Sequence, residues 1–481
     1  MKKHITRRLA LGLLTLIGGL VQAQTVSVLY NFGSAYDPIG FYNPGTLAQA
    51  ADGNIYTTSS YGGNAGTGNP ADGTVFNMST AGALSELITF TWDSSGLLPY
   101  GVDPYSGLTL GTDGYFYGTT SSGGVINGAN AYHGTVFRID SSGHLTTLYT
   151  FTGGSDGAEP FAAPVEGTDG NFYGTTAVCG GIQTCIVGQA GGTVYQLTPA
   201  GVLTTLHQFD CSIGCSSYAP LVQGTDGNFY GTTATNPGSI FMITPSGAFT
   251  TLYQFDPAGG NGWYPNALIQ GSDGNFYGTT QANGTDNAGV IFKMTSAGTV
   301  TVLHTFSHTA PDGFQTLAGL VQATDGNLYG VTVNGGTSGD GVIFRVGPTG
   351  GSSYSVRYSF NGTTGFGPAV ALLQHTNGLL YGLTHGGGVN NWGTFYSLNE
   401  RLKPFVSLVS TSGTVGQTVG IVGQGFKKTK KVSFGGTNAS YTVVTDTYLT
   451  ATVPAGATTG SVTVKMAGGT LQSNKTFYVT P

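Results

Sequence analysis

Short runs of alternating apolar and polar residues fill most of the chain, and they predict strands rather than helices. In the run 145–151, two leucines and a phenylalanine are interspersed with threonine and tyrosine, which we interpret as the pattern of a half-buried strand. Thr, Val, Tyr and Phe are frequent, whereas Glu, Lys and Arg are scarce. Because the frequent types favour strands and the scarce types favour helices, we expect an all-β protein.

One segment of about ten residues recurs along the chain and divides it into equivalent units. The sequence GTDGYFYGTT at 111–120 returns as GTDGNFYGTT at 167–176. Further copies centre on Asp226-Gly227, Asp273-Gly274 and Asp325-Gly326, with weaker ones at Asp52-Gly53 and Asn377-Gly378. Seven copies about 50 residues apart predict seven repeats of one supersecondary unit.

Each unit is predicted to contain four antiparallel strands. Asp-Gly between two apolar runs indicates a hairpin turn, because Gly accepts positive φ and Asp tolerates it. A variable loop then precedes a third strand such as Gly134-Thr135-Val136-Phe137, and a short turn leads to a fourth strand. Seven four-stranded units are typical of a β-propeller, so we expect a seven-bladed one.

The two ends of the repeat region predict how this propeller is closed. The seventh unit ends after its third strand, at 395–398, and residues 26–32 have the pattern of the missing fourth strand. Pairing these segments would remove an unpaired sheet edge, so we expect the N-terminal strand to complete the last blade. The alternative is an open solenoid, which would have no use for a displaced strand.

The repeats resemble the Gloeo/Verruco (GloVer) tandem-repeat family of exported bacterial proteins over about residues 45–400. The resemblance is carried by the Asp-Gly-Asn-Phe-Tyr-Gly-Thr-Thr core and the Gly-Thr-Val-Phe strand. It implies the repeat architecture and export, and it implies no particular chemistry.

The last 80 or so residues form a second domain with several short predicted strands. Its segments include Gly423-Gln424-Gly425-Phe426, Val432-Ser433-Phe434-Gly435-Gly436 and Gly460-Ser461-Val462-Thr463-Val464. Together these segments resemble IPT/TIG domains, which implies an immunoglobulin-like β-sandwich serving as a spacer or protein-contact module. We therefore expect a signal peptide at 1–23, the propeller at 24–400 and the sandwich at 401–481.

The first residues predict export. Lys2, Lys3, Arg7 and Arg8 precede a short apolar run, and Val21-Gln22-Ala23 offers a cleavage site, as in a secretory signal peptide. We expect an extracellular, cell-surface or periplasmic protein without a transmembrane segment. In such a compartment Cys179, Cys185, Cys211 and Cys215 are predicted to form disulfides, with the pairing left open and a metal site as the alternative.

Charge divides the chain into an acidic propeller and a basic tail. Residues 24–399 contain twenty acids and four bases, whereas residues 400–481 contain two acids and eight bases. An acidic propeller excludes nucleic acid as its ligand, because phosphate contacts need Lys and Arg. The cluster Lys427, Lys428, Lys430 and Lys431 is interpreted as a solvated loop, or as a contact for an anionic wall polymer or for the acidic propeller itself.

The longer loops of an up-and-down blade emerge on one face, and they carry the candidate ligand-binding residues. These residues are Trp92, Trp263, Trp392, Tyr264, Asp93, Asp103 and Asp256. Further aromatic residues in the same loops include Tyr132, Tyr218 and Phe366. Aromatic rings beside carboxylates suit a sugar, whose apolar face stacks while its hydroxyls meet acceptors. In the alternative, the aromatics pack between blades and the acids keep a base-poor protein soluble.

These features favour a secreted or surface-associated binding or scaffold protein that recognises a glycan or another exported protein on the loop face. The second hypothesis is a carbohydrate-active enzyme, a glycoside hydrolase or lyase, that uses loop carboxylates. A passive envelope scaffold is the third. The sequence has no His pair at metal spacing and no nucleophile elbow. We therefore assign no catalytic residue, metal or cofactor, and the sequence leaves the oligomeric state open.

Overall fold

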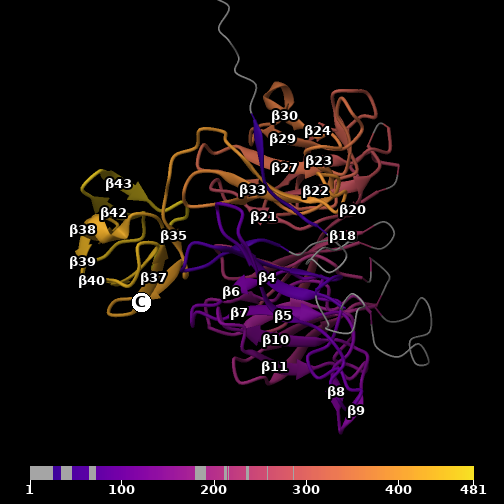
Figure 1. The fold of residues 1–481 in the computed structure, drawn as a ribbon, viewed down its shortest axis with the longest axis horizontal. Coiled ribbons are helices and arrows are strands. Elements are labelled where there is room, and N and C mark those ends of the chain that lie inside the picture. The colour runs from indigo at the N-terminus through magenta and orange to yellow at the C-terminus, as the bar shows by residue number, and fades with distance from the viewer. Residues whose placement is uncertain are drawn as a thin grey trace, which may run out of the picture.

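The structure is a computed structural model that describes residues 25–33, 46–63, 72–178, 191–210, 214, 216–234, 238–256, 258–284 and 286–480 (Figure 1). Within these residues the chain is all-β, and its only helices are the single-turn 3₁₀ helices η1 (Gly351–Ser353) and η2 (Phe426–Lys428). In the same residues no helix combines the length and apolar character needed to cross a membrane.

The repeats form sheets in which four strands follow one another in the order predicted from the sequence. The first strands are β2 (Ala48–Gln49), β6 (Thr109–Leu110), β12 (Val165–Glu166), β16 (Val222–Gln223), β21 (Ile269–Gln270), β26 (Val321–Gln322) and β32 (Leu373–Gln374). The second strands are β3 (Ile55–Ser59), β7 (Phe116–Thr120), β13 (Phe172–Thr175), β17 (Phe229–Thr233), β22 (Phe276–Ala282), β27 (Leu328–Thr332) and β33 (Leu380–Gly386). The third strands are β4 (Thr74–Met78), β10 (Thr135–Ile139), β14 (Thr193–Leu197), β18 (Ser239–Ile243), β23 (Val290–Met294), β29 (Val342–Val346) and β34 (Thr394–Leu398).

The fourth strands complete the sheets. Six of them follow their own third strands: β5 (Leu84–Thr89), β11 (Leu145–Thr150), β15 (Leu203–Gln208), β19 (Phe249–Gln254), β24 (Val300–Thr305) and β30 (Ser355–Ser359). The loops add the short strands β8 (Val125–Ile126), β9 (Ala129–Asn130), β20 (Trp263–Pro265), β25 (Gly313–Phe314), β28 (Asn334–Gly335) and β31 (Phe366–Pro368). We number the units 1 to 7 in the order of their first strands.

The fourth strand of unit 7 comes from the other end of the repeat region, as predicted. Strand β1 (Val26–Asn31) pairs antiparallel with β34, with Val28 opposite Tyr396 and Tyr30 opposite Phe395. The ladder has a register shift between Val28 and Tyr30. The same irregularity occurs in the third-to-fourth strand pairs of the other units, for example between Val136 and Phe137. Strand β1 therefore has both the place of a fourth strand in the sheet and the register shift that fourth strands share.

The recurrent Asp-Gly-Asn-x-Tyr segment locks the turn between the first and second strands. In unit 4 the Asp226 carboxylate accepts hydrogen bonds from the Asn228 backbone N–H at 3.2 Å and from the Tyr230 hydroxyl at 2.8 Å. Gly227 has a φ of 85°, a value that L side chains rarely adopt. Equivalent Tyr–Asp bonds occur in units 1, 2, 3, 5 and 6. The most repeated motif therefore has a structural role at this turn.

Neighbouring units are joined by a repeated polar contact. The side chain that ends a first strand accepts a hydrogen bond from a backbone N–H in the turn of the preceding unit, as Gln223 does from Thr168 at 3.0 Å. Glu166, Gln270, Gln322 and Gln374 make the same contact with their preceding units. Unit 2 has Leu110 at this position and keeps only the ring stack between Tyr56 and Phe116, with centroids 4.4 Å apart, which also occurs at other junctions, as between Tyr173 and Phe229 at 3.9 Å.

The same contact joins unit 7 to unit 1. The Gln49 side chain of unit 1 accepts from the Thr376 N–H at 3.0 Å and donates to the Thr376 hydroxyl at 2.8 Å. His375, 1% exposed, holds a glycine or alanine position of the repeat, and its Nε2 lies 3.0 Å from the carbonyl oxygen of Gly53. Burial lowers the pKa of His375. The histidine that is particular to unit 7 thus contacts unit 1.

The C-terminal domain is a two-sheet sandwich. Its elements are β35 (Ser407–Leu408), β36 (Ser412–Thr414), β37 (Thr418–Val422), β38 (Thr429–Phe434), β39 (Thr437–Ala439), β40 (Tyr441–Val443), β41 (Tyr448–Thr452), β42 (Val462–Met466), β43 (Gly469–Gln472) and β44 (Tyr478–Thr480). One sheet has the order β35-β37-β41-β40 and the other β39-β38-β42-β43. Residues from both sheets, including Ile421, Leu449, Val432 and Val464, form one buried core.

This domain contacts the turns of units 7 and 1. The Gln424 amide donates to the Thr376 hydroxyl at 3.1 Å, and the Thr447 hydroxyl donates to the Ala51 carbonyl at 2.6 Å. The domain therefore lies against the place where the first and last units meet, on the side of the Asp-Gly turns.

Candidate functional site

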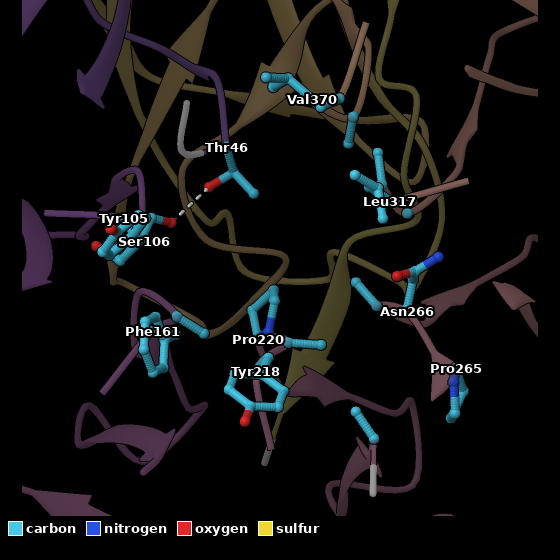
Figure 2. A pocket seen from close by; sticks show the side chains of 18 of the residues that line it. Thr46, Tyr105, Ser106, Phe161, Tyr218, Pro220, Pro265, Asn266, Leu317 and Val370 are labelled. Carbon is cyan, nitrogen blue, oxygen red and sulfur yellow. Dashed lines mark hydrogen bonds between the residues drawn. The ribbon is translucent and has the colours of Figure 1, made fainter. Parts of the chain in front are cut away.

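A cavity lies among the residues that lead into the first strands, on the side of the molecule opposite the Asp-Gly turns. Its volume is about 490 Å³, within the range of small-molecule sites. Each unit contributes to its wall, and the contributing segments include Thr46, Tyr105, Phe161, Tyr218, Asn266, Leu317 and Val370. Figure 2 shows these side chains arranged around one opening. The site thus depends on the mutual arrangement of all the units.

Three aromatic side chains form a continuous wall on one side of the cavity, and we call them the aromatic arc. The rings of Tyr105 and Phe161 have centroids 5.4 Å apart, and those of Phe161 and Tyr218 lie 5.3 Å apart. Tyr218 is 48% exposed. Such tilted contacts hold the rings in place and leave apolar surface facing the opening.

The rest of the lining is mainly small and apolar, with a few polar groups. Ala219, Ala267, Ala318 and Val370 contribute methyl groups. Asn266 is buried, and its amide nitrogen donates to Thr279 and to the Thr316 carbonyl, both at 2.9 Å. Its oxygen accepts from the Gln281 amide at 3.1 Å. Asn266 and Gln281 are therefore held in defined orientations at the edge of an apolar space.

The approach to the first strand has the same backbone conformation in several units but different side chains. Asp103, Glu159, Tyr264 and Gln315 have φ values of 56°, 54°, 53° and 60°. Left-handed conformations of non-glycine residues are uncommon and cluster at functional positions. In units 2 and 3 the N–H of this residue donates to a carbonyl of the preceding unit, Asp103 to Asp72 at 2.9 Å and Glu159 to His133 at 3.0 Å. The backbone is thus fixed while the side chain is free to differ between units.

Two acids meet at the junction of units 1 and 2. Burial, and then the charge of Asp72, raise the pKa of Asp103 to about 6, and burial also raises the pKa of Asp72. Tyr105 of the aromatic arc lies two residues after Asp103. Burial, and then the charge of Asp103, raise the pKa of Tyr105. At the next junction burial raises the pKa of Glu159, and His133 opposes that shift.

Replacing Asp103 by asparagine is expected to stabilise the protein above pH 6. Because the folded pKa lies above the unfolded value, folding takes up a proton, and wild-type stability falls as the pH rises from about 4 through 6. Allowing for solvent screening, the gain in Asp103→Asn at pH 8 should be about 1–2 kcal/mol and should vanish near pH 4. Thermal melts from pH 4 to 8 measure this. Asp340→Asn is the control, because Asp340 takes the place of Asp72 in unit 6, and the residue whose N–H donates to its backbone carbonyl is Gly367, which has no carboxylate. Equal pH profiles for wild type and Asp103→Asn would contradict the expectation.

The structure brings some predicted site residues close to the cavity and leaves others apart. Asp103 and Tyr264 take equivalent backbone positions beside it, and Trp263 precedes Tyr264 in β20 with ring centroids 6.0 Å apart. Trp392 lies in a separate pocket of about 230 Å³ with Phe366, His385, Asn390 and Asn391. Trp92 is 49% exposed. Among the described residues no ring contact joins the three tryptophans to one another.

Asp93 and Asp256 hold their own loops. The Asp93 carboxylate accepts from the backbone N–H groups of Ser95 and Leu97, and Asp256 accepts from that of Ala258. The four cysteines lie outside the described residues, so the predicted disulfides stay predictions. The part of the chain that the structure describes contains no group of three metal-binding side chains.

Tyr105, Phe161 and Asn266 were not among the residues chosen from the sequence. A signal for them was present, because each follows a proline: Pro104, Pro160 and Pro265. This proline fixes the chain just before the first strand, and the residue after it lines the cavity.

The matches with known families agree with this architecture. The model of the Gloeobacter/Verrucomicrobia repeat matches residues 16–186, 99–268 and 264–425, and that of the IPT/TIG domain matches residues 404–479. No curated protein matches the chain in sequence.

Similar solved structures are distant in sequence. A provisionally named gluconolactonase is 10% identical with a TM-score of 0.40, over 79% of this chain and 94% of that chain. A provisionally named 6-phosphogluconolactonase from Bacteroides uniformis is 16% identical with a TM-score of 0.47, over 71% and 95%. The extracellular domain of a provisionally assigned one-component system from B. thetaiotaomicron is 9% identical with a TM-score of 0.48, over 91% and 57%. Similarities at this level indicate no substrate or partner for this chain. By its family matches, the chain belongs to the Gloeobacter/Verrucomicrobia repeat family and ends in an IPT/TIG domain.

Proposed function

We propose that the units are the seven blades of a closed β-propeller, with residues 24–400 as the propeller and 401–481 as the sandwich. The support is that units 7 and 1 share the contact that joins other neighbours, Gln49 with Thr376. Apolar packing repeats as well, since Tyr381 of unit 7 shares a cluster with Ile55 of unit 1, as Tyr173 does with Phe229 between units 3 and 4. Closure gives the long loops one common face and the cavity a position on the central axis.

On this frame the protein is an exported, non-catalytic binding protein that takes part of a glycan into the mouth of the cavity. The observation that carries this proposal is the aromatic arc beside an apolar cavity of about 490 Å³. The apolar face of a sugar ring stacks on aromatic rings, and its hydroxyls need a few fixed polar groups. Gln281 supplies such a group on the wall, and its amide is oriented by the hydrogen bond to the Asn266 oxygen. A segment of another exported protein is the alternative occupant.

Removing the rings of the arc is expected to weaken glycan binding by about 10- to 100-fold, since each stacked ring contributes about 1–3 kcal/mol. The experiment screens the full chain on a glycan array and then measures the best ligand by calorimetry with Phe161→Ala and Tyr218→Ala. Tyr132→Ala is the matched control, because Tyr132 is a 53% exposed aromatic outside the cavity lining. An equal loss in Tyr132→Ala would contradict the proposal, as would an array without any ligand.

The carboxylates at the junction of units 1 and 2 favour a carbohydrate-active enzyme as the second candidate. An acid with a pKa near 6, such as Asp103, can protonate a leaving group at neutral pH. Asp72 would then act as its anionic partner. Turnover of a polysaccharide panel that is lost in Asp103→Asn and retained in Asp340→Asn would replace the binding proposal by this one.

A further inference from the structure

The outer face of one sheet of the C-terminal domain carries positive charge that the protein itself does not neutralise. In β38 and β42 the side chains of Val432, Phe434, Val462 and Val464 enter the core. Because side chains alternate along a strand, Lys431, Thr463 and Lys465 point away from it. Lys431 and Lys465 are exposed and directly opposite each other in the ladder. Like charges in that position repel.

Three more lysines lie at the start of the same strand. Lys427 and Lys428 are in η2 and Lys430 follows at the beginning of β38, and all three are exposed. We call Lys427, Lys428, Lys430, Lys431 and Lys465 the lysine face. Figure 1 shows β38, β42 and β43 on the side of the domain that lies away from the repeat sheets. The domain contacts the repeats through neutral groups, Gln424 and Thr447.

The carboxylates of the domain do not balance the lysine face. Residues 400–481 contain only two acids, Glu400 and Asp446. Glu400 pairs with Arg357, and Asp446 accepts a hydrogen bond from the backbone N–H of Lys427 at 2.9 Å. The ion pairs found among the described residues include none with a lysine. The cluster therefore faces solvent as a concentrated positive charge and not as part of an internal network.

The side chains between the lysines indicate which polyanion suits this face. Along the ladders Asn438 lies opposite Ser433, Gln472 opposite Thr463 and Thr470 opposite Lys465. Ser433 is buried and its hydroxyl is bonded to that of Thr463 at 2.7 Å, whereas Asn438, Thr470 and Gln472 are exposed and can bond sugar hydroxyls. None of these outward residues is aromatic or arginine, whereas stacking on bases uses aromatic rings and bidentate phosphate contacts use arginine. The exposed face of this sheet therefore combines lysines with neutral hydroxyl and amide side chains.

We propose that the lysine face binds an acidic polysaccharide, a glycan chain bearing carboxylates. Each lysine that pairs with a carboxylate releases condensed counterions, so the binding depends steeply on salt. This surface is separate from the cavity, and it would hold the chain on a charged polymer while the loop face stays open.

The test uses the full chain and polygalacturonate, with fully methyl-esterified polygalacturonate as the matched neutral polymer. Wild type should bind the acid form at least 10-fold more tightly than the ester. Lys431→Gln with Lys465→Gln should weaken binding at least 10-fold, and should lower the slope of log affinity against log salt by roughly 1.4, from about 0.7 for each lost ion pair. The control is Arg401→Gln with Lys403→Gln, which removes the same charge outside the face and should change affinity less than 2-fold.

Several results would overturn the proposal. These are equal losses in the two double variants, equal binding of acid and ester, or linear polyphosphate or duplex DNA binding as tightly per charge as polygalacturonate. Phe161→Ala serves as a further comparison, because it should leave this binding unchanged. Its behaviour separates a failure of the lysine face from a failure of the cavity proposal.

Discussion

Replacing Phe32 by alanine is expected to lower the free energy of unfolding by about 3–5 kcal/mol, the usual cost of removing a buried aromatic ring. Phe32 follows β1 and is 2% exposed. Its ring lies edge-on to those of Tyr30 and Phe76, with centroids 5.2 and 6.4 Å away. Phe76 belongs to unit 1, so this side chain contacts both units that meet at the proposed closure.

Phe32→Ala should also loosen strand β1 selectively, because of the way in which β1 joins its sheet. Strand β1 is joined to its sheet by pairing and packing and not by a turn from β34, so loss of the Phe32 anchor should release it. Hydrogen exchange of the amides in Val26–Asn31 should then accelerate more than that of the rest of the chain. Phe151→Ala is the matched control, because Phe151 has the same role after β11 and is fully buried. Its strand is held by the turn from β10, so β11 should stay protected. Equal exchange in β1 and β11 would contradict a closure that depends on β1.

Replacing Arg357 by methionine should destabilise the protein by about 3–5 kcal/mol, the cost of removing one partner of a buried ion pair. Arg357 lies in β30 of unit 6, and its Nη2 donates to the Glu400 carboxylate at 2.9 Å while its Nε donates at 3.1 Å. The Glu400 side chain is only 1% exposed. Without the guanidinium, a carboxylate stays in an environment of low dielectric constant with its cation gone.

The double variant Arg357→Met with Glu400→Met provides the sharper measurement. Replacing both partners by apolar side chains removes the buried charge, so most of the lost stability should return. Urea denaturation of the two single variants and the double variant gives the coupling free energy. Arg138→Met serves as the control, since the Arg138 guanidinium lies 4.8 Å from the Tyr115 ring centroid and its loss should cost only about 1 kcal/mol. If the double variant is as unstable as Arg357→Met alone, the lost stability comes from the packing of the arginine's aliphatic stem and not from the buried charge.

Phe32→Ala and Arg357→Met test the contacts of unit 7 with its two neighbours, unit 1 and unit 6. Phe32 holds its fourth strand and its contact with unit 1, whereas Glu400 joins the end of β34 to unit 6. If the ring is closed, both should affect the same cooperative unit, and the melts of the two variants should lose the whole repeat region in one transition.

The strands, turns and unit boundaries could be read from the sequence because they depend on local rules. Asp226-Gly227 predicts its turn through the positive φ of glycine and the hydrogen-bonding capacity of aspartate. The mixture of leucine, threonine and aromatic residues in 145–151 predicts β11, because these residue types suit a half-buried strand. Even the pairing of β1 with β34 could be predicted from the sequence, because the seventh unit lacked a fourth strand and the N-terminal segment had the pattern of one.

The cavity was not accessible in this way, because its wall combines one or a few residues from each unit. Tyr105, Phe161 and Tyr218 are more than 50 residues apart in sequence, and only the packing of neighbouring units makes them one surface. Conversely, Trp92 and Trp392 stand out by residue type, yet the structure places neither in the cavity wall.

By itself, then, the sequence determined the all-β class, the repeating unit with its locked turn, the displaced strand β1 and the separate basic domain. Each of these follows from neighbouring residues or from a period. The tertiary structure alone decided that Asp103 meets Asp72, that the aromatic arc borders a cavity, and that Lys431 faces Lys465. The physical reason is that burial, pKa shifts and like-charge repulsion depend on distances between side chains, and those distances exist only once the units and sheets are packed.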